Sequence, residues 1–232
     1  MRIVVAKVAD FPPGERRIVT EGRRSIGVFR IGDRFYALYL TAAVLGQRQS
    51  SLLGLRWQDV APDFSEARWP MRLLRTRDGW ELRSVERSRS KRAPKRLPLP
   101  APVAAGLRAH QANQQREREL ARGNWYSLTV DGKDVDLVFT MRDGRPVYGS
   151  WATEQFQRRL AEAGLEKRRF HDLRHSAASI MIALGLPLKV VSEVLGHAGI
   201  QITSDVYGHL EDDVLREQLR VLDTAWADRE TG

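Results

Sequence analysis

The 232-residue chain contains no cysteine. This excludes disulfide bridges, a cysteine nucleophile, thiolate-bound metals and a cysteine-ligated iron–sulfur cluster. The chain also has no apolar run close to the roughly 18 residues that a membrane span needs, and its N-terminus lacks the apolar stretch and cleavage site of a signal peptide. We therefore expect a cytoplasmic protein that makes no membrane contact.

Acidic residues are the minority among the charged side chains. The chain has 29 Asp and Glu against 38 Lys and Arg, which gives a formal net charge of +9 at pH 7. An excess of this size favours a polyanionic partner, and nucleic acid is the first candidate. Charge alone leaves open the alternative of a basic protein that is merely soluble.

Turn-forming residues divide the chain into parts of different character. Up to about residue 39, runs such as "RRIVT" and "RSIGVFRIGDRFYAL" predict short strands. The turn "RDG" between "EARWPMRLL" and "WELRSVE" predicts a hairpin, and "SSLLGLRW" is predicted to start a helix with a serine cap. Beyond residue 150 the pattern is helical almost throughout. The sequence thus predicts an α+β fold that is mostly helical, with small antiparallel hairpins. Helix ends are predicted at Gly46, Gly164, Gly185 and Gly196.

Histidine is scarce as well, yet three of the five histidines lie between residues 168 and 197. On a helix, His171 and Arg174 share a face. A guanidinium that binds two oxygens and an imidazole that moves a proton together suit a phosphate, and His197 follows a predicted helix end from which it can point to the same place. His171 and His175 could instead hold a metal ion, but without cysteine or a His-Glu-x-x-His pattern we expect no metal site.

Several segments together resemble a known family. "HDLRHS", "EVLGHAGIQIT" and "DVYGHL" are similar to the C-terminal signature of tyrosine recombinases, the phage integrase family. The upstream "LGQRQSSLLGLRWQDV" resembles the first box of that family and places its arginine at Arg48, while Ser51 stands where the family often has glutamate. The resemblance runs from Leu40 to Trp226. We therefore interpret residues 40–232 as a tyrosine recombinase catalytic domain.

The resemblance implies that the protein cuts and rejoins double-stranded DNA without a metal or another cofactor. Tyr207 attacks the scissile phosphate and forms a 3′-phosphotyrosyl bond, whose energy is kept for joining a new strand. Arg48, Arg174 and His197 bind the non-bridging oxygens of the transition state, and His171 accepts the proton of the tyrosine. The resemblance also implies a homo-tetramer on a recombination site, in the integration or excision of a mobile element.

The family also uses a hairpin lysine that protonates the leaving oxygen. The basic stretch "RSRSKRAPKRLPLP" offers Arg89, Lys91 and Lys95 for this role. Counting back from "PLP" places Arg89 near the lysine position, but a guanidinium, with a pKa above about 12, is a poor acid. We therefore assign the role to Lys91.

Residues 1–39 lie outside the recombinase pattern. "VADFPPGERRIVTEGRRSIGVFRIGDRFYAL" resembles the opening strands of a Rieske-type ferredoxin domain, but the Cys-x-His cluster ligands are missing. We expect these residues to be too few for the helical core-binding domain of the family. We therefore expect a β-rich leader fused to a truncated recombinase of weak activity. The alternatives are an inactive remnant and a non-catalytic DNA-binding protein that uses "SAASIMIALGLPLKVVSEVLGH" as a helix-turn-helix.

Overall fold

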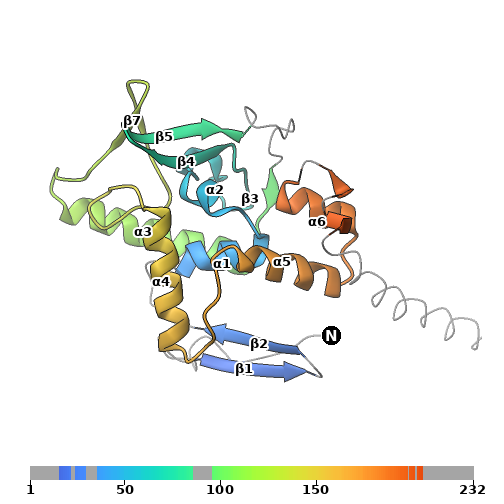
Figure 1. Cartoon of the computed structure of the whole chain (residues 1–232). Helices are drawn as coiled ribbons and strands as arrows, with labels where there is room; N and C mark the ends of the chain where they lie inside the picture. Colours follow the sequence, from blue (N-terminus) through green and yellow to red (C-terminus); the bar gives the residue numbers. More distant parts are fainter. Residues whose placement is uncertain are drawn as a thin grey trace, which may run out of the picture.

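The computed structural model describes residues 16–21, 24–29, 36–85, 96–197, 199–201 and 203–205, with side chains from residue 36 onwards. Antiparallel strand pairs and helices alternate along these ranges (Figure 1), so the predicted α+β class is confirmed. The helices are α1 (Tyr36–Leu45), α2 (Gln49–Leu53), α3 (Ala101–Leu120), α4 (Gly149–Glu162), α5 (Asp172–Ala183) and α6 (Leu188–Leu195), with a 3-10 helix at Trp57–Asp59. The strands are β1 (Arg16–Glu21), β2 (Arg24–Phe29), β3 (Glu66–Ala67), β4 (Met71–Thr76), β5 (Gly79–Ser84), β6 (Leu97–Pro98), β7 (Leu128–Val130) and β8 (Lys133–Val135).

Helix α1 forms the centre of the molecule, in contact with α3, α5 and α2 (Figure 1). Its buried residues recur at the helical spacing and join a core that includes Trp69, Phe139 and Phe156. A second, smaller cluster lies between α5 and α6 and contains Ala177 and Val191. Both of these clusters lie beside the junction of α1 and α2. In α1 the buried side chains are those of Ala37, Leu38, Tyr39, Thr41, Ala42 and Leu45.

Two local predictions are wrong. The short strand expected at the end of "RSIGVFRIGDRFYAL" is not formed, because the chain is already helical at Tyr36. Burial decides this, because "YALYLTAAVL" is apolar nearly all round, and a helix of this kind is stable where it is surrounded by other elements, as α1 is by α2, α3 and α5. The predicted serine cap of α2 is also absent, since Arg48 occupies the cap position and makes no side-chain capping bond.

Glycines end the helices as predicted. Gly196 is the left-handed C-cap of α6 (φ 67°, ψ 45°), and Gly46, directly after α1, has φ 61°. A Cβ at Gly46 would lie 2.5 Å from Leu195 Cδ2, so a side chain at this position would press against the end of α6. The C-terminal ends of α1 and α6 therefore lie against each other, at a turn whose backbone conformation favours glycine. Gly164 and Gly185, with φ of 63° and 80°, follow α4 and α5.

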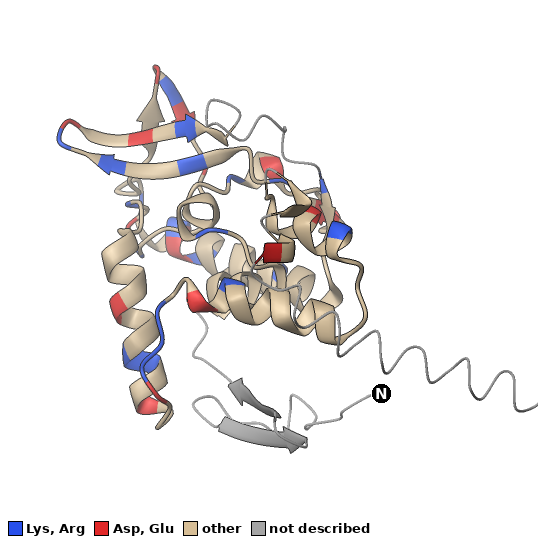
Figure 2. Ribbon diagram, turned by 45° about the vertical axis from the view of Figure 1, so that its right-hand side comes forward, with Lys and Arg blue, Asp and Glu red and all other residues tan. Residues whose placement is uncertain are grey.

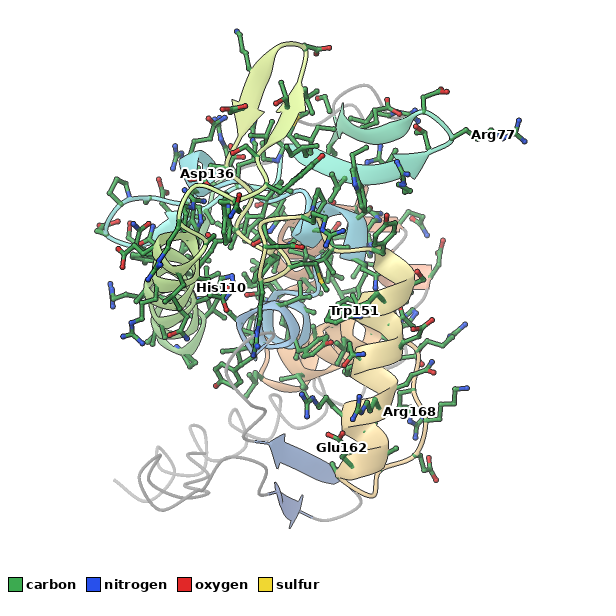
Figure 3. All side chains as sticks on the ribbon, turned by 90° about the vertical axis from the view of Figure 1, so that its left-hand side faces the viewer. Arg77, His110, Asp136, Trp151, Glu162 and Arg168 are labelled. Atoms are coloured by element: carbon green, nitrogen blue, oxygen red, sulfur yellow. The ribbon has the colours of Figure 1, made fainter. Side chains whose placement is uncertain are left out.

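The hairpin of β4 and β5 is confirmed, with Thr76 paired to Gly79 across its tip. Basic residues lie along both of its strands (Figure 2), and Arg77 projects from the tip (Figure 3). The ring of Trp80 packs at a tilt against that of Tyr148, with 4.8 Å between ring centroids, which ties the hairpin to the start of α4. No helix in the described ranges is long and apolar enough to cross a membrane.

Candidate active site

Arg48 lies in the turn between α1 and α2, as the residue that precedes α2. Its Nη1 is 3.5 Å from the carbonyl oxygen of Gly196, which is at the outer limit of a hydrogen bond. The side chain is exposed to solvent, while desolvation by the surrounding protein and repulsion from Arg72 on β4 lower its pKa. Arg48 is thus held weakly and can exchange its carbonyl contact for a phosphate oxygen.

Arg174 lies on α5 and is 5% exposed. Its Nη1 donates hydrogen bonds to the carbonyl oxygens of Gly46 (2.7 Å) and Leu195 (2.8 Å). These two bonds fix the guanidinium between the turn that carries Arg48 and the C-terminal end of α6. A cation is favourable at this end of a helix, because the unpaired carbonyls carry partial negative charge.

Gln47 is a site residue that the sequence did not reveal. It is 9% exposed, and its Nε2 donates a hydrogen bond of 2.5 Å to the carbonyl oxygen of Val194. The side chain therefore ties the residue beside Arg48 to the last turn of α6. Its position next to Arg48 was the available signal, but only the fold shows that the amide faces α6.

His171 precedes α5 as its N-cap residue and is exposed. Its ring lies edge-to-face with that of His175, with 5.3 Å between ring centroids. Desolvation lowers the pKa of His171, and the charges of His175, Arg174 and Arg48 lower it further. A neutral imidazole at pH 7 can accept a proton, as a general base must.

His197 follows the C-cap glycine of α6, and its Nδ1 lies 2.7 Å from Oγ1 of the buried Thr203. Desolvation, together with the charges of Arg174 and Arg48, lowers the pKa of His197 to about 4. The ring is therefore neutral at pH 7 and can act as a hydrogen-bond donor through one of its nitrogens.

These contacts bring four of the predicted site residues to one place: Arg48, Arg174, His171 and His197. The charged neighbours that lower the pKa values of the two histidines are cations or histidines. The positive charge of these neighbours favours a bound anion, and the two guanidinium groups suit a phosphodiester. In the described ranges no group of three or more His, Asp or Glu could hold a metal ion.

Three of the other residues considered for the site lie outside the described residues: Lys91, its rival Arg89, and Tyr207. Asp172, next to His171, accepts hydrogen bonds from the backbone nitrogen and the guanidinium of Arg169, at 2.8 to 3.1 Å. It is therefore a local ion-pair residue, as its position at the start of a helix favours.

Comparison with known proteins decides the family. Residues 30–213 match the phage integrase family. The chain belongs to the phage integrase family. A XerC-like tyrosine recombinase of Caldanaerobacter subterraneus subsp. tengcongensis is 32% identical over 185 residues, which cover 77% of this chain and 46% of the relative. An integrase of Saccharopolyspora erythraea is 32% identical over 115 residues, which cover 50% of this chain and 24% of that protein.

Among solved structures, the phage integrase fold is shared with the Tn1549 transposon integrase in complex with transposon right end DNA. The TM-score is 0.66 at 20% identity, over 82% of this chain and 59% of that one. The match to the two curated relatives named above covers about half or less of their length. The match to the phage integrase family includes both "HDLRHS" and "LGQRQ".

Proposed function

We propose that this chain cuts and rejoins strands of double-stranded DNA at a specific site, through a 3′-phosphotyrosyl intermediate. The observation that carries the proposal is the convergence of Arg48, Arg174 and His197 at the C-terminal end of α6. His171 lies close enough to both arginines that their charges lower its pKa. Two guanidinium groups and two neutral imidazoles supply positive charge, hydrogen-bond donors and a proton acceptor for one phosphate. Membership of the phage integrase family supports the same chemistry.

In the proposed reaction, Tyr207 attacks the scissile phosphorus and the 5′-oxygen leaves. His171 accepts the phenolic proton, because a phenol of pKa about 10 needs a base at neutral pH. Arg48, Arg174 and His197 bind the non-bridging oxygens, on which charge accumulates in the transition state. Lys91 protonates the leaving oxygen. The new phosphotyrosyl ester keeps the bond energy, so attack by another 5′-hydroxyl joins the strands again.

The proposal extends to the partner and the assembly. Duplex DNA fits the +9 net charge and the basic residues of the β4–β5 hairpin, since phosphate contacts supply much of the affinity of such proteins. The Tn1549 integrase was solved on transposon end DNA, and we extend that partner to this chain. We also propose a homo-tetramer on a recombination site, a cytoplasmic location, and a division between a leader at residues 1–39 and a catalytic domain at 40–232.

The test is a covalent adduct on nicked suicide DNA taken from the sequences that flank the gene. The wild-type chain should give an SDS-resistant protein–DNA product. Tyr207→Phe should give no such product, although it should bind DNA as well as the wild-type chain does. Arg174→Lys should slow formation of the product at least tenfold. An adduct that persists in Tyr207→Phe would refute the assigned nucleophile.

The α5–α6 pair supports a second candidate, a DNA-binding protein without catalysis. The two helices pack against each other across a short turn, as in a helix-turn-helix. Such a protein does not need Tyr207. Its DNA affinity should depend on exposed α6 residues such as Lys189, with no adduct on any flanking DNA.

A further inference from the structure

The contact between His197 and Thr203 has a consequence for catalysis. Thr203 is fully buried, in a helical segment that follows α6. Two hydrogen bonds of Ser192, on α6, hold the residues that precede this segment. The Ser192 carbonyl oxygen accepts from the backbone nitrogen of His197 (3.0 Å), and the Ser192 Oγ donates to the carbonyl oxygen of Gly199 (3.3 Å). The backbone of His197 is therefore anchored to α6, and burial restricts Thr203 beside its ring.

The hydrogen atoms in this contact can be assigned. A neutral imidazole carries one N–H, and a separation of 2.7 Å between Nδ1 and Oγ1 requires that one atom donates to the other. If Nδ1 donated, the Thr203 hydroxyl would need another acceptor in a buried place. Within the described ranges, the ring of His197 is the hydrogen-bond partner of this hydroxyl. The hydroxyl therefore donates to Nδ1, and the ring proton lies on Nε2.

We propose that Thr203 is a positioning residue that holds His197 in the tautomer with the proton on Nε2, so that the neutral ring donates a hydrogen bond to the scissile phosphate. The catalytic part of this inference rests on the proposed function. In the other tautomer, Nε2 would present a lone pair and repel the charged oxygens of the transition state. The hydroxyl thus makes the ring a donor without a positive charge.

A neutral donor fits the electrostatics of the site. Arg174 and Arg48 already supply two positive charges, and together with burial they hold the pKa of His197 at about 4. A third positive charge is therefore unfavourable before DNA binds. Fixing the tautomer supplies the donor at pH 7 without protonation of the ring.

The first test reads the tautomer directly, on the whole chain without DNA. Long-range proton–nitrogen NMR correlations of the histidine rings at pH 7, with His197→Gln to assign the signals, should show the His197 proton on Nε2. Thr203→Val, which replaces the hydroxyl by a methyl group, should give the Nδ1–H form or a mixture, and Thr203→Ser should restore the wild-type pattern. A proton on Nδ1 in the wild type, or no change in Thr203→Val, overturns the proposal.

The second test is the rate of adduct formation on suicide DNA. Thr203→Val should slow it about 10- to 100-fold, less than the roughly 100- to 1000-fold loss expected when one transition-state donor is removed outright, because the ring remains and only its tautomer changes. DNA affinity should be unchanged, and Thr203→Ser should recover the rate to within about threefold. Thr41→Val is the matched control, since Thr41 is also fully buried, and its Oγ1 donates to the Ala37 carbonyl oxygen at 2.6 Å, within α1, and not to a site residue.

A double variant separates positioning from general loss of structure. Glutamine has a side-chain donor that does not depend on a tautomer, so Thr203→Val should change the rate less than about twofold in a His197→Gln background. An equal loss in both backgrounds would refute the positioning role. A wild-type chain that forms no adduct would count against the proposed function, while the NMR measurement still decides the tautomer.

Discussion

Replacing Gly46 by alanine tests how closely the end of α6 is pressed against the turn that carries Arg48. Gly46 has φ 61°, a conformation that costs about 1–2 kcal/mol for a residue with a Cβ. The new Cβ would also lie 2.5 Å from Leu195 Cδ2 and 3.2 Å from Ala177 Cβ. Leu195 is 1% exposed, so its side chain could move away only by displacing its neighbours in the core. Overpacking of this kind adds about 1–3 kcal/mol.

The matched control is Gly132→Ala. Gly132 has φ 71°, in the turn between β7 and β8, and nothing lies within 4 Å of a Cβ built there. This variant has the conformational cost alone, about 1–2 kcal/mol. Gly46→Ala should therefore lower the free energy of unfolding by about 2–5 kcal/mol, and its Tm should lie about 2–12 °C below that of the control.

Urea denaturation and thermal melting of the two variants measure the difference. Gly46→Ala should also slow adduct formation, because the Gly46 carbonyl oxygen accepts a hydrogen bond from Arg174. If the free energies of unfolding of the two variants differ by less than about 0.5 kcal/mol, the end of α6 does not pack closely against the turn that carries Arg48.

Three further predictions concern titration and buried charge. His197 has a folded-state pKa of about 4 against an ordinary 6.5, so the unfolded chain takes up this proton first as the pH falls. The contribution of His197 to the free energy of unfolding should be constant above pH 6.5 and fall by at most about 3 kcal/mol between pH 6.5 and 4. His197→Gln should reduce this loss in urea titrations at acid pH. The lowered pKa of His171 predicts that adduct formation at sub-saturating DNA stays constant from pH 9 down to pH 6.5 and declines only below it; a decline that begins above pH 7 would contradict its assignment as the base. Asp59 is fully buried and accepts hydrogen bonds from Arg56 and Arg68, so Asp59→Asn should cost about 1–3 kcal/mol in urea denaturation, against less than about 1 kcal/mol for Asp136→Asn in an exposed pair.

The sequence by itself determined the family, the chemical types at the site, the ends of four helices and one hairpin turn. Glycine ends helices through a backbone property that holds wherever the residue stands, so Gly46, Gly164, Gly185 and Gly196 could be placed without the fold. The hairpin at "RDG" follows from alternation and turn chemistry. The segments "LGQRQSSLLGLRWQDV", "HDLRHS" and "EVLGHAGIQIT" contain the four site residues that the structure brings together.

Tertiary structure decided what depends on burial and on contacts between distant segments. The start of α1 at Tyr36, where a strand was expected, follows from packing against α3 and α5, which a local pattern does not contain. The hydrogen bonds of Gln47 with Val194, of Arg174 with Gly46, and of Thr203 with His197 depend on where α6 ends in space. A side-chain amide or hydroxyl has several partners open to it along a chain, and only the folded backbone selects one.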